Sequence, residues 1–467
     1  MSRWARLIEA ARTLERATRP VHPDTAEALM RRWEELPSRV RTPAQLLGRR
    51  TAGCEGTHGV FPRCNLACTP CYHSREANRV PVDGEHTVAE IDRQMAHLRA
   101  VRGPGQHAQL IGGEVTLLGP EDHARALEVM RRHARKPMSM THGDFDYGYL
   151  ERLALDHGGR PRFRSLAFAA HFDSLMLGRR AAARPDSERE LHPHRRAFVA
   201  MFERLRREHG VRYDLAHNMT VSPANLGQVA EVVRACMAMG FGMLSFQPAA
   251  HLGNPRRWRE DYRSITVDDV WREIERGAGT RLPHRHLQMG DERCNRTAYG
   301  LLVGDRWIPL LDDRDPADLR VRDRFLAHFS GMDFDDRRAL VAARVARVIA
   351  RHPTDVAHAL RWGLRFARRA GLLRLARGHP RALTFVVHAF MDAAEVRPAW
   401  EALKRGQTAT DPGVRAAQER LLACSYAMAH PDEDLLVPAC VQHAVLDPAE
   451  NMRLAELLNR SAPAPPG

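Results

Sequence analysis

Cys64-Asn-Leu-Ala-Cys68-Thr-Pro-Cys71-Tyr72 decides how this chain is interpreted, because it holds three cysteines within eight residues. One turn of this length can bring three thiolates to a point, and thiolate is the ligand that zinc and iron–sulfur clusters select. A structural zinc site needs four protein ligands, and no fourth ligand follows at zinc-finger spacing, although a zinc knuckle remains the alternative. Three cysteines on a 4Fe–4S cluster leave one iron open, so the sequence predicts a reactive metal centre.

A second motif follows about forty residues later in the chain. Ala108-Gln-Leu-Ile111 is expected to form a short buried strand that leads into Gly112-Gly113-Glu114-Val115-Thr116. Two glycines let the backbone approach a ligand closely, and a carboxylate past a strand end can hold an ammonium group. This pair of motifs resembles the radical S-adenosylmethionine (SAM) superfamily, from whose usual pattern Pro70 and Val115 depart.

The resemblance implies a cofactor set and a reaction. A 4Fe–4S cluster on Cys64, Cys68 and Cys71 would bind SAM and cleave it reductively. The resulting 5′-deoxyadenosyl radical would abstract hydrogen from an unactivated carbon, in an oxygen-sensitive enzyme supplied with electrons by a donor such as flavodoxin or ferredoxin. The residues expected to contact SAM are Tyr72, Gly112, Gly113, Glu114, Thr116, Asp173, Ser174 and Thr220. Of these, Glu114 is expected to hold the ammonium group and Asp173 or Ser174 the ribose, with helix capping as the alternative role.

The predicted architecture is α/β, because short apolar runs alternate with amphipathic helices along the first half of the chain. The strands are expected at 108–111, 137–140, 165–169, 213–216 and 243–246. Together with a first strand expected at 59–62 they suit a partial (β/α)6 barrel, whose site would lie at the carboxyl ends of the strands. The expected domains are an N-terminal helical segment (1–50), the radical SAM core barrel (51–290), a mostly α C-terminal domain (291–460) and a disordered tail (461–467).

Four of the other cysteines form a second candidate ligand set. Cys54, Cys294, Cys424 and Cys440 lie outside regular apolar faces, whereas Cys236 is expected in the core. With Phe390-Met391-Asp392 and His430, these cysteines resemble the branch of the superfamily that contains tetraether lipid synthase and the dihydropterin methyltransferases. The resemblance implies that they hold one auxiliary 4Fe–4S cluster, with independent buried thiols as the alternative. The chain departs from this branch in having no cysteine before Cys54.

The net charge of +14 indicates an anionic partner, although the near absence of lysine also fits a GC-rich genome. Residues 337–381 hold twelve arginines and one acidic residue on amphipathic helices. These helices suit binding to an anionic membrane surface; the alternative is that they are ordinary solvent-exposed helices with no membrane role. No apolar run could span a membrane and no signal peptide is evident, so the expected location is the cytoplasm or the inner face of its membrane.

Three functions follow from these patterns. The first is a radical SAM enzyme that forms a C–C bond or methylates a lipid or lipid-linked substrate. The second is a maturase of a peptide or small natural product. The third is an iron–sulfur redox sensor or nucleic-acid-binding protein, which leaves the Gly-Gly-Glu strand end unexplained; nucleic acid is therefore not the expected partner.

Overall fold

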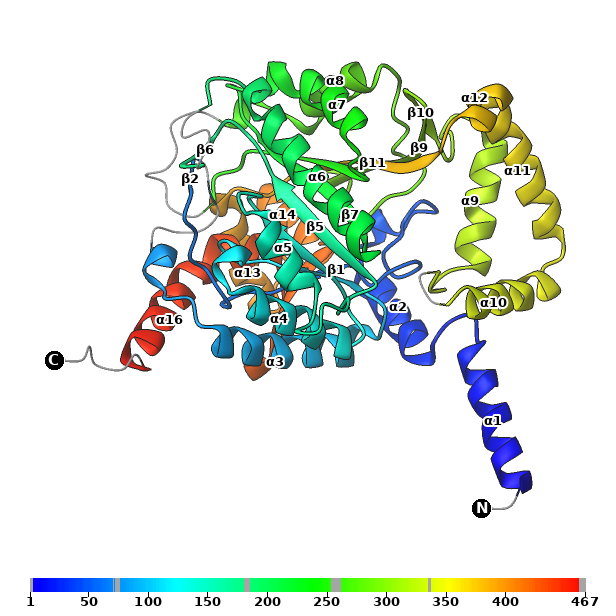
Figure 1. Ribbon diagram of the computed structural model, residues 1–467, viewed down its shortest axis with the longest axis horizontal. Coiled ribbons are helices and arrows are strands. Elements are labelled where there is room, and N and C mark those ends of the chain that lie inside the picture. The colour runs from blue at the N-terminus through cyan, green and yellow to red at the C-terminus, as the bar shows by residue number, and fades with distance from the viewer. Residues whose placement is uncertain are drawn as a thin grey trace.

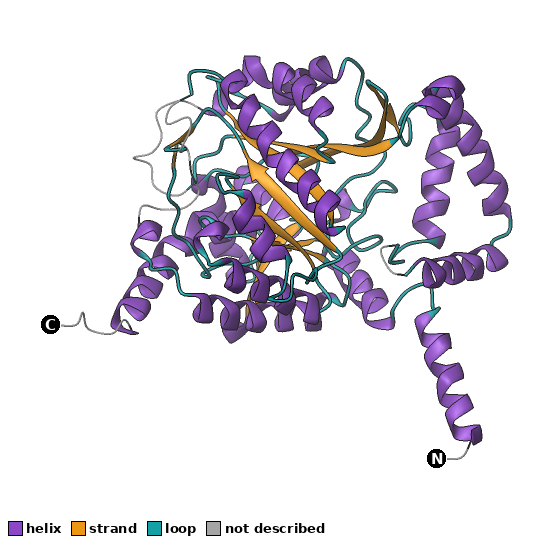
Figure 2. Ribbon diagram, in the orientation of Figure 1, coloured by secondary structure: helices purple, strands orange, loops and turns teal. Residues whose placement is uncertain are grey.

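The computed structural model describes residues 3–69, 71, 76–179, 185–252, 262–334 and 337–461. A curved sheet of 11 strands runs through the described part, with helices outside it (Figures 1 and 2). Its strand order is β10-β9-β11-β8-β7-β5-β4-β3-β1-β12-β13. The expected SAM contact Tyr72 lies outside the described residues.

The centre of the sheet is a partial (β/α) barrel, as the sequence predicts. Six neighbouring strands in this centre are all parallel. They are β1 (Cys54–Gly56), β3 (His107–Leu110), β4 (Lys136–Thr141), β5 (Ser165–His171), β7 (Arg212–Val221) and β8 (Met243–Pro248). The helices between them are α3 (Gly84–Arg102), α4 (Pro120–Arg132), α5 (Tyr147–Ala154), α6 (His192–His209) and α7 (Val229–Met239). The five later strands are present at or around their expected bounds, whereas the first, expected at 59–62, lies earlier in the chain as β1.

Strands that follow α8 (Val267–Ala278) in the chain extend both edges of this barrel. On one edge β11 (Arg381–His388) runs parallel to β8, followed by β9 (Asn295–Val303) and β10 (Arg306–Pro309). On the other edge β12 (Tyr426–His430) runs parallel to β1, and β13 (Leu435–Pro438) pairs with β12. The segment expected as a separate C-terminal domain therefore supplies five strands to the same sheet.

The main core lies between the sheet and its outer helices. Phe168 of β5 packs against Phe202 of α6, with ring centroids 5.0 Å apart, and Phe198 lies 5.1 Å from Phe202. All three are almost fully buried. Each such side chain contributes about 1.5–3 kcal/mol through burial alone. This packing holds α6 against β5.

The remaining helices lie around the barrel. They are α1 (Arg3–Ala17), α2 (Pro23–Glu35), α8 (Val267–Ala278), α9 (Pro316–His328), α10 (Arg338–Arg351), α11 (Thr354–Ala370), α12 (Leu372–Arg377), α13 (Ala393–Lys404), α14 (Pro412–Leu422), α15 (Ala439–Val441) and α16 (Asp447–Ser461). Figure 1 shows α9 to α12 as a group at the β10 end of the sheet, with α1 projecting nearby. The predicted arginine-rich helices are therefore present. Among the described residues, no helix combines the length and apolar character that crossing a membrane requires.

Candidate active site

The cysteine loop is fixed by a short strand pair next to the end of β5. In this pair β2 (Ala67–Cys68) runs antiparallel to β6 (Met176–Leu177), and Thr69 N donates to the Leu175 carbonyl at 3.1 Å. At the other end of the loop, Cys64 N donates to Asn78 Oδ1 at 3.0 Å. The loop is thus held at both ends before any ligand binds.

The structure brings the three thiols of this loop together. Cys68 hydrogen-bonds with Cys71, and Cys64 lies near enough to both to affect their ionisation. Burial raises the pKa of Cys64 to about 12, and the Cys71 hydrogen bond together with burial raises that of Cys68 well above its ordinary value. Buried thiols of this kind become thiolates when a metal replaces their protons, so the donor set fits an iron–sulfur cluster.

The two glycines after β3 hold the cysteine loop. Gly113 N donates to the Phe61 carbonyl at 2.7 Å, and Glu114 N donates to the Arg63 carbonyl at 2.9 Å. A Cβ at Gly113 would lie 2.0 Å from the Arg63 oxygen, and one at Gly112 would lie 2.6 Å from the Phe61 ring. The glycines therefore permit a close backbone approach, and here the approach is to the stem that carries Cys64.

Glu114 connects two strand ends. Its Oε1 accepts hydrogen bonds from Thr141 Oγ1 (2.7 Å) and from Thr116 Oγ1 (2.7 Å) and N (3.1 Å). Its Oε2 accepts from His142 N at 2.8 Å. The carboxylate is 1% exposed and begins a short 3₁₀ turn at Val115, so it does act as a helix cap. A carboxylate in this position can also accept from an ammonium group.

Asp173 lies beside the cysteine loop at the end of β5. It accepts from His171 Nε2 (2.5 Å), Thr220 N (3.0 Å) and Leu175 N (2.9 Å). Burial acts to raise its pKa, but the charge and hydrogen bond of His171 and the backbone donors lower it overall. Its charge in turn acts on Cys68. Asp173, Thr220 and the cysteine loop therefore meet at one place.

Ser174, a predicted SAM contact, and His142, a neighbour of the site, connect the strand ends to adjacent segments. Ser174 N donates to Glu188 Oε1 at 2.7 Å, which ties the Asp173 turn to the segment before α6. His142, just after β4, hydrogen-bonds through Nε2 to Asn65 Oδ1 at 2.8 Å. The sequence places His142 among the polar residues at the strand ends, in the segment 141–144, but gives neither His142 nor Asn65 a specific role. Their positions, one after a strand end and one between two cysteines, were the available signal.

The second cysteine set also comes together. The thiol of Cys424 lies near enough to those of Cys54, Cys294 and Cys440 to affect their ionisation. Burial raises the pKa of Cys54 to about 11 and that of Cys294 to about 11. Arg420 Nε donates to Cys294 Sγ at 3.1 Å. Four thiols with a guanidinium beside them fit a 4Fe–4S cluster, whose thiolate ligands carry negative charge.

None of the eight cysteines, all of which are described, forms a disulfide. Cys236 is fully buried within the main core, as expected. The two ligand sets take separate positions on β1: Cys54 begins this strand, whereas the loop with Cys64 follows its end.

Sequence reasoning missed a group of polar side chains next to the Gly-Gly-Glu strand end. His58 follows β1, His430 ends β12, and Glu450 lies on α16; their ligand atoms lie within 4.8 Å of one another. His58 also lines a small cavity together with Gly112 and Asp447. His58 lies hundreds of positions before His430 and Glu450, so no local pattern could have revealed the group.

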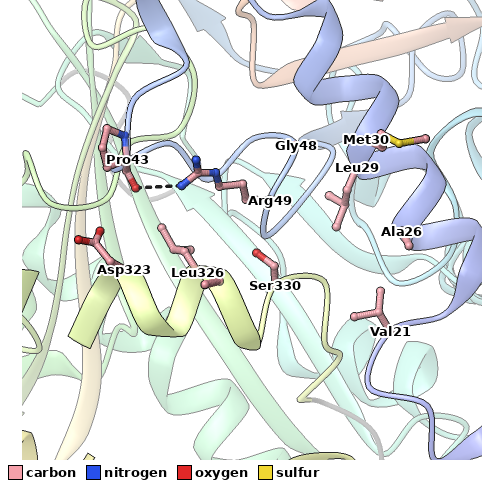
Figure 3. Close-up of a pocket in the computed structure, with 11 residues that line it drawn as sticks. Val21, Ala26, Leu29, Met30, Pro43, Gly48, Arg49, Asp323, Leu326 and Ser330 are labelled. Carbon is pink, nitrogen blue, oxygen red and sulfur yellow. Dashed lines mark hydrogen bonds between the residues drawn. The ribbon is translucent and has the colours of Figure 1, made fainter. Parts of the chain in front are cut away.

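A larger cavity of about 560 Å³ lies elsewhere, between α2, α9 and the loop around Arg49 (Figure 3). Its wall is mostly apolar, with Leu29 and Leu326 on opposite helices. Its charged lining residues are Arg49 and Asp323.

Comparison with known proteins gives weak structural likenesses. No protein-family model matches the chain, and no curated protein matches it. SuiB from Streptococcus suis is similar over 47% of this chain and 45% of SuiB, at 16% identity and a TM-score of 0.33. The S-adenosylmethionine-bound form of SuiB is similar over 48% of this chain and 46% of SuiB, at 14% identity and a TM-score of 0.34. Native anSMEcpe with bound AdoMet is similar over 47% of this chain and 57% of its own length, at 16% identity and a TM-score of 0.30. The match spans about half the length of each of these proteins, and a likeness of this strength says nothing by itself about activity.

Proposed function

We propose that this chain is a radical SAM enzyme. The observation that carries the proposal is the convergence of Cys64, Cys68 and Cys71 beside the carboxyl ends of β3 and β5, next to Gly112–Glu114. Sites in parallel barrels form at these strand ends. A bound 4Fe–4S cluster with SAM supplies one-electron cleavage of the sulfonium and a 5′-deoxyadenosyl radical for hydrogen abstraction.

The chain's own part is to bind, orient and exclude water. The backbone N–H groups of Gly113 and Glu114 hold the cysteine stem against the end of β3, and the Glu114 side chain offers a buried carboxylate for the ammonium group of SAM. Asp173 and Thr220 offer a carboxylate and a hydroxyl for the ribose on the other side of the loop. A buried and rigid polar wall of this kind orients a ligand without reorganising when it binds.

The test is SAM cleavage by anaerobically reconstituted protein with dithionite, measured as 5′-deoxyadenosine together with iron per chain. The wild-type chain should form 5′-deoxyadenosine, and Cys68→Ser should abolish it and lower the iron content by one cluster. The core variant Cys236→Ser is the matched control and should keep both. Wild-type protein that holds iron but cleaves no SAM would contradict the proposal.

We further propose that Cys54, Cys294, Cys424 and Cys440 hold an auxiliary 4Fe–4S cluster. The mutual approach of these thiols and the adjacent Arg420 support it. Cys440→Ser should lower iron by about four atoms per chain while the Cys64–Cys71 cluster remains. Iron content equal to that of the wild type would show that the four are independent thiols.

A lipid or lipid-linked substrate is the candidate that a specific feature of the structure favours. Leu360 and Leu364, one turn apart on α11, are 66% and 61% exposed, and Leu372 and Leu373 of α12 are 71% and 72% exposed. Arginines are exposed beside them along the same two helices. They are Arg361, Arg368, Arg374 and Arg377. Exposed leucines flanked by arginines have the chemistry of a helix that lies on an anionic membrane.

The membrane proposal is tested by flotation with vesicles of phosphatidylglycerol and phosphatidylcholine. The wild-type chain should float with these vesicles in a salt-sensitive manner, and Leu364→Glu should weaken binding about tenfold through the lost burial of one leucine. Leu422→Glu, at an exposed leucine of α14, is the control and should bind like the wild type. Equal binding by all three chains would count against this surface. A peptide or natural-product substrate, and flavodoxin or ferredoxin as the electron donor, stay predictions.

A further inference from the structure

We propose that His58, His430 and Glu450 form a binding site for one divalent first-row transition ion, separate from both cysteine sets. His58 Nδ1 lies 3.1 Å from Glu450 Oε2, and His430 Nδ1 lies 3.7 Å from Glu450 Oε1. The three side chains are only 10–17% exposed. They come from the ends of two neighbouring parallel strands and from α16, so backbone elements fix all three.

The hydrogen bonds behind His58 fix its tautomer. Its Nε2 lies 2.8 Å from the carbonyl oxygen of Ala429. A carbonyl can only accept, so Nε2 carries the proton and donates. In the neutral ring Nδ1 then carries no proton, and its lone pair faces the Glu450 carboxylate.

The same reasoning applies to His430. Gln442 Nε2 donates to Asp447 Oδ1 at 2.9 Å and to Glu450 Oε2 at 2.7 Å, so its other amide atom is the oxygen. That oxygen, Oε1, lies 2.7 Å from His430 Nε2 and accepts its proton. In neutral His430, Nδ1 therefore also carries a lone pair, which faces Glu450. Ligating histidines characteristically donate their other ring nitrogen to a carbonyl or amide oxygen in this way.

Three acceptor atoms that face one another are satisfied by a cation between them, which is either a metal ion or the proton of a charged His58; burial lowers the pKa of His58, but the hydrogen bond and charge of Glu450 raise it overall. Two imidazoles and one carboxylate are a donor set that suits zinc, iron(II) or manganese(II). Asp447 lies nearby and is paired with His443 Nδ1 at 2.7 Å, so Glu450 is the carboxylate that a bound ion would neutralise. The two imidazole rings are stacked with their centroids 4.1 Å apart, so an ion shared by both requires one ring to tilt within the reach of the hydrogen bond at its Nε2.

The surroundings of the triad point to a ligand as well. His58 and Asp447 line the same small cavity as Gly112 and Asn451. Asn451 is 2% exposed, and its Nδ2 has no hydrogen-bond partner within the described part of the chain. Gln442 lies in a π-helical turn, Gln442–Leu446, a distortion that is frequent at functional sites. If the proposed function holds, an ion here would present an oxygen-bearing group of the substrate beside the SAM site.

The test is zinc binding by the anaerobically purified holoprotein. The protein is treated with EDTA, equilibrated with zinc sulfate and analysed for zinc and iron in the same sample. Wild-type chains should bind one zinc with saturation, His430→Gln and Glu450→Gln should lose it, and Gln442→Leu should bind it about 10–100-fold more weakly. His209→Gln alters an exposed group of Glu151, Glu208 and His209 and serves as the control, with zinc binding equal to that of the wild type.

The outcomes separate this inference from the proposed function. Unchanged iron content and circular dichroism in the two triad variants show that they are folded with their clusters. The inference would be overturned if the wild type and these variants bind zinc equally, or if the wild type binds none. His58 would then be a protonated side chain paired with Glu450. Because 5′-deoxyadenosine is measured on the same samples, zinc binding without SAM cleavage contradicts only the proposed function, and cleavage without zinc contradicts only the metal site.

Discussion

Gly113→Ala should separate the cysteine loop from the sheet without touching a cysteine. The new Cβ would lie 2.0 Å from the Arg63 carbonyl oxygen and 2.4 Å from that of Pro62, where ordinary contact begins at 3.4 Å. Both neighbours are backbone, so the stem must move by more than about 1 Å, at a cost of about 1–3 kcal/mol. The movement also weakens the hydrogen bonds that Gly113 N and Glu114 N donate, each worth about 1 kcal/mol.

These terms give about 2–5 kcal/mol against the docked loop, or about 30-fold to a few thousand-fold in the ratio of docked to undocked forms. The assay is iron per chain and 5′-deoxyadenosine formation after anaerobic reconstitution, and both should fall. Gly119→Ala is the matched control, because its Cβ would meet only the Glu121 side chain at 3.9 Å. If Gly113→Ala retains the iron and the cleavage rate of the control, the close approach is not what holds the loop.

Three further changes test the scaffold around the site. Burial lowers the pKa of His123 to about 3. Between that pH and about 6.5 the unfolded chain therefore binds more protons than the folded chain, and the free energy of unfolding falls as the pH falls. His123→Gln should flatten this pH dependence, measured by urea unfolding, by about 1.4 kcal/mol per pH unit. Glu188→Gln removes the partner that lies 2.7 Å from the buried Arg195 and should cost about 3–5 kcal/mol in the same unfolding assay, and a cost near zero would contradict this. Asn65→Ala removes the hydrogen bond from His142 and should speed iron loss to a chelator about fivefold, whereas an unchanged rate would show that this contact does not retain the cluster.

The parallel strands and the cysteine loop were predictable because their signals are local. Apolar runs such as Ser165–Ala169, each followed by a helix, identify βαβ units. The spacing of Cys64, Cys68 and Cys71 indicates one ligand set within a single loop. Local signals of this kind do not depend on where the rest of the chain lies.

The pairing of the two chain halves could not be predicted, because it depends on contacts of very long range. His58 and Glu450 lie 392 positions apart, and the pairing of β12 with β1 has no signature in either strand. The prediction made for the two glycines was incomplete for the same reason. Close approach was expected at Gly113, but only the fold shows that the approaching group is the Arg63 backbone.

Strand β1 is the element through which the two cysteine sets and the histidine–carboxylate triad become neighbours. It is three residues long, with Cys54 at its start and His58 just past its end. Its parallel partner β12 aligns Cys54 with Tyr426 and Gly56 with Met428, which places Cys424 near the start and His430 near the end.

This register links the two ends of the strand pair. A slip of one residue would turn every β12 side chain to the other face of the sheet. It would remove Cys424 from Cys54 and His430 from His58 in the same step. The hydrogen bond from Cys54 N to the Ser425 carbonyl, at 2.7 Å, therefore serves both sites at once, although it contacts only one of them.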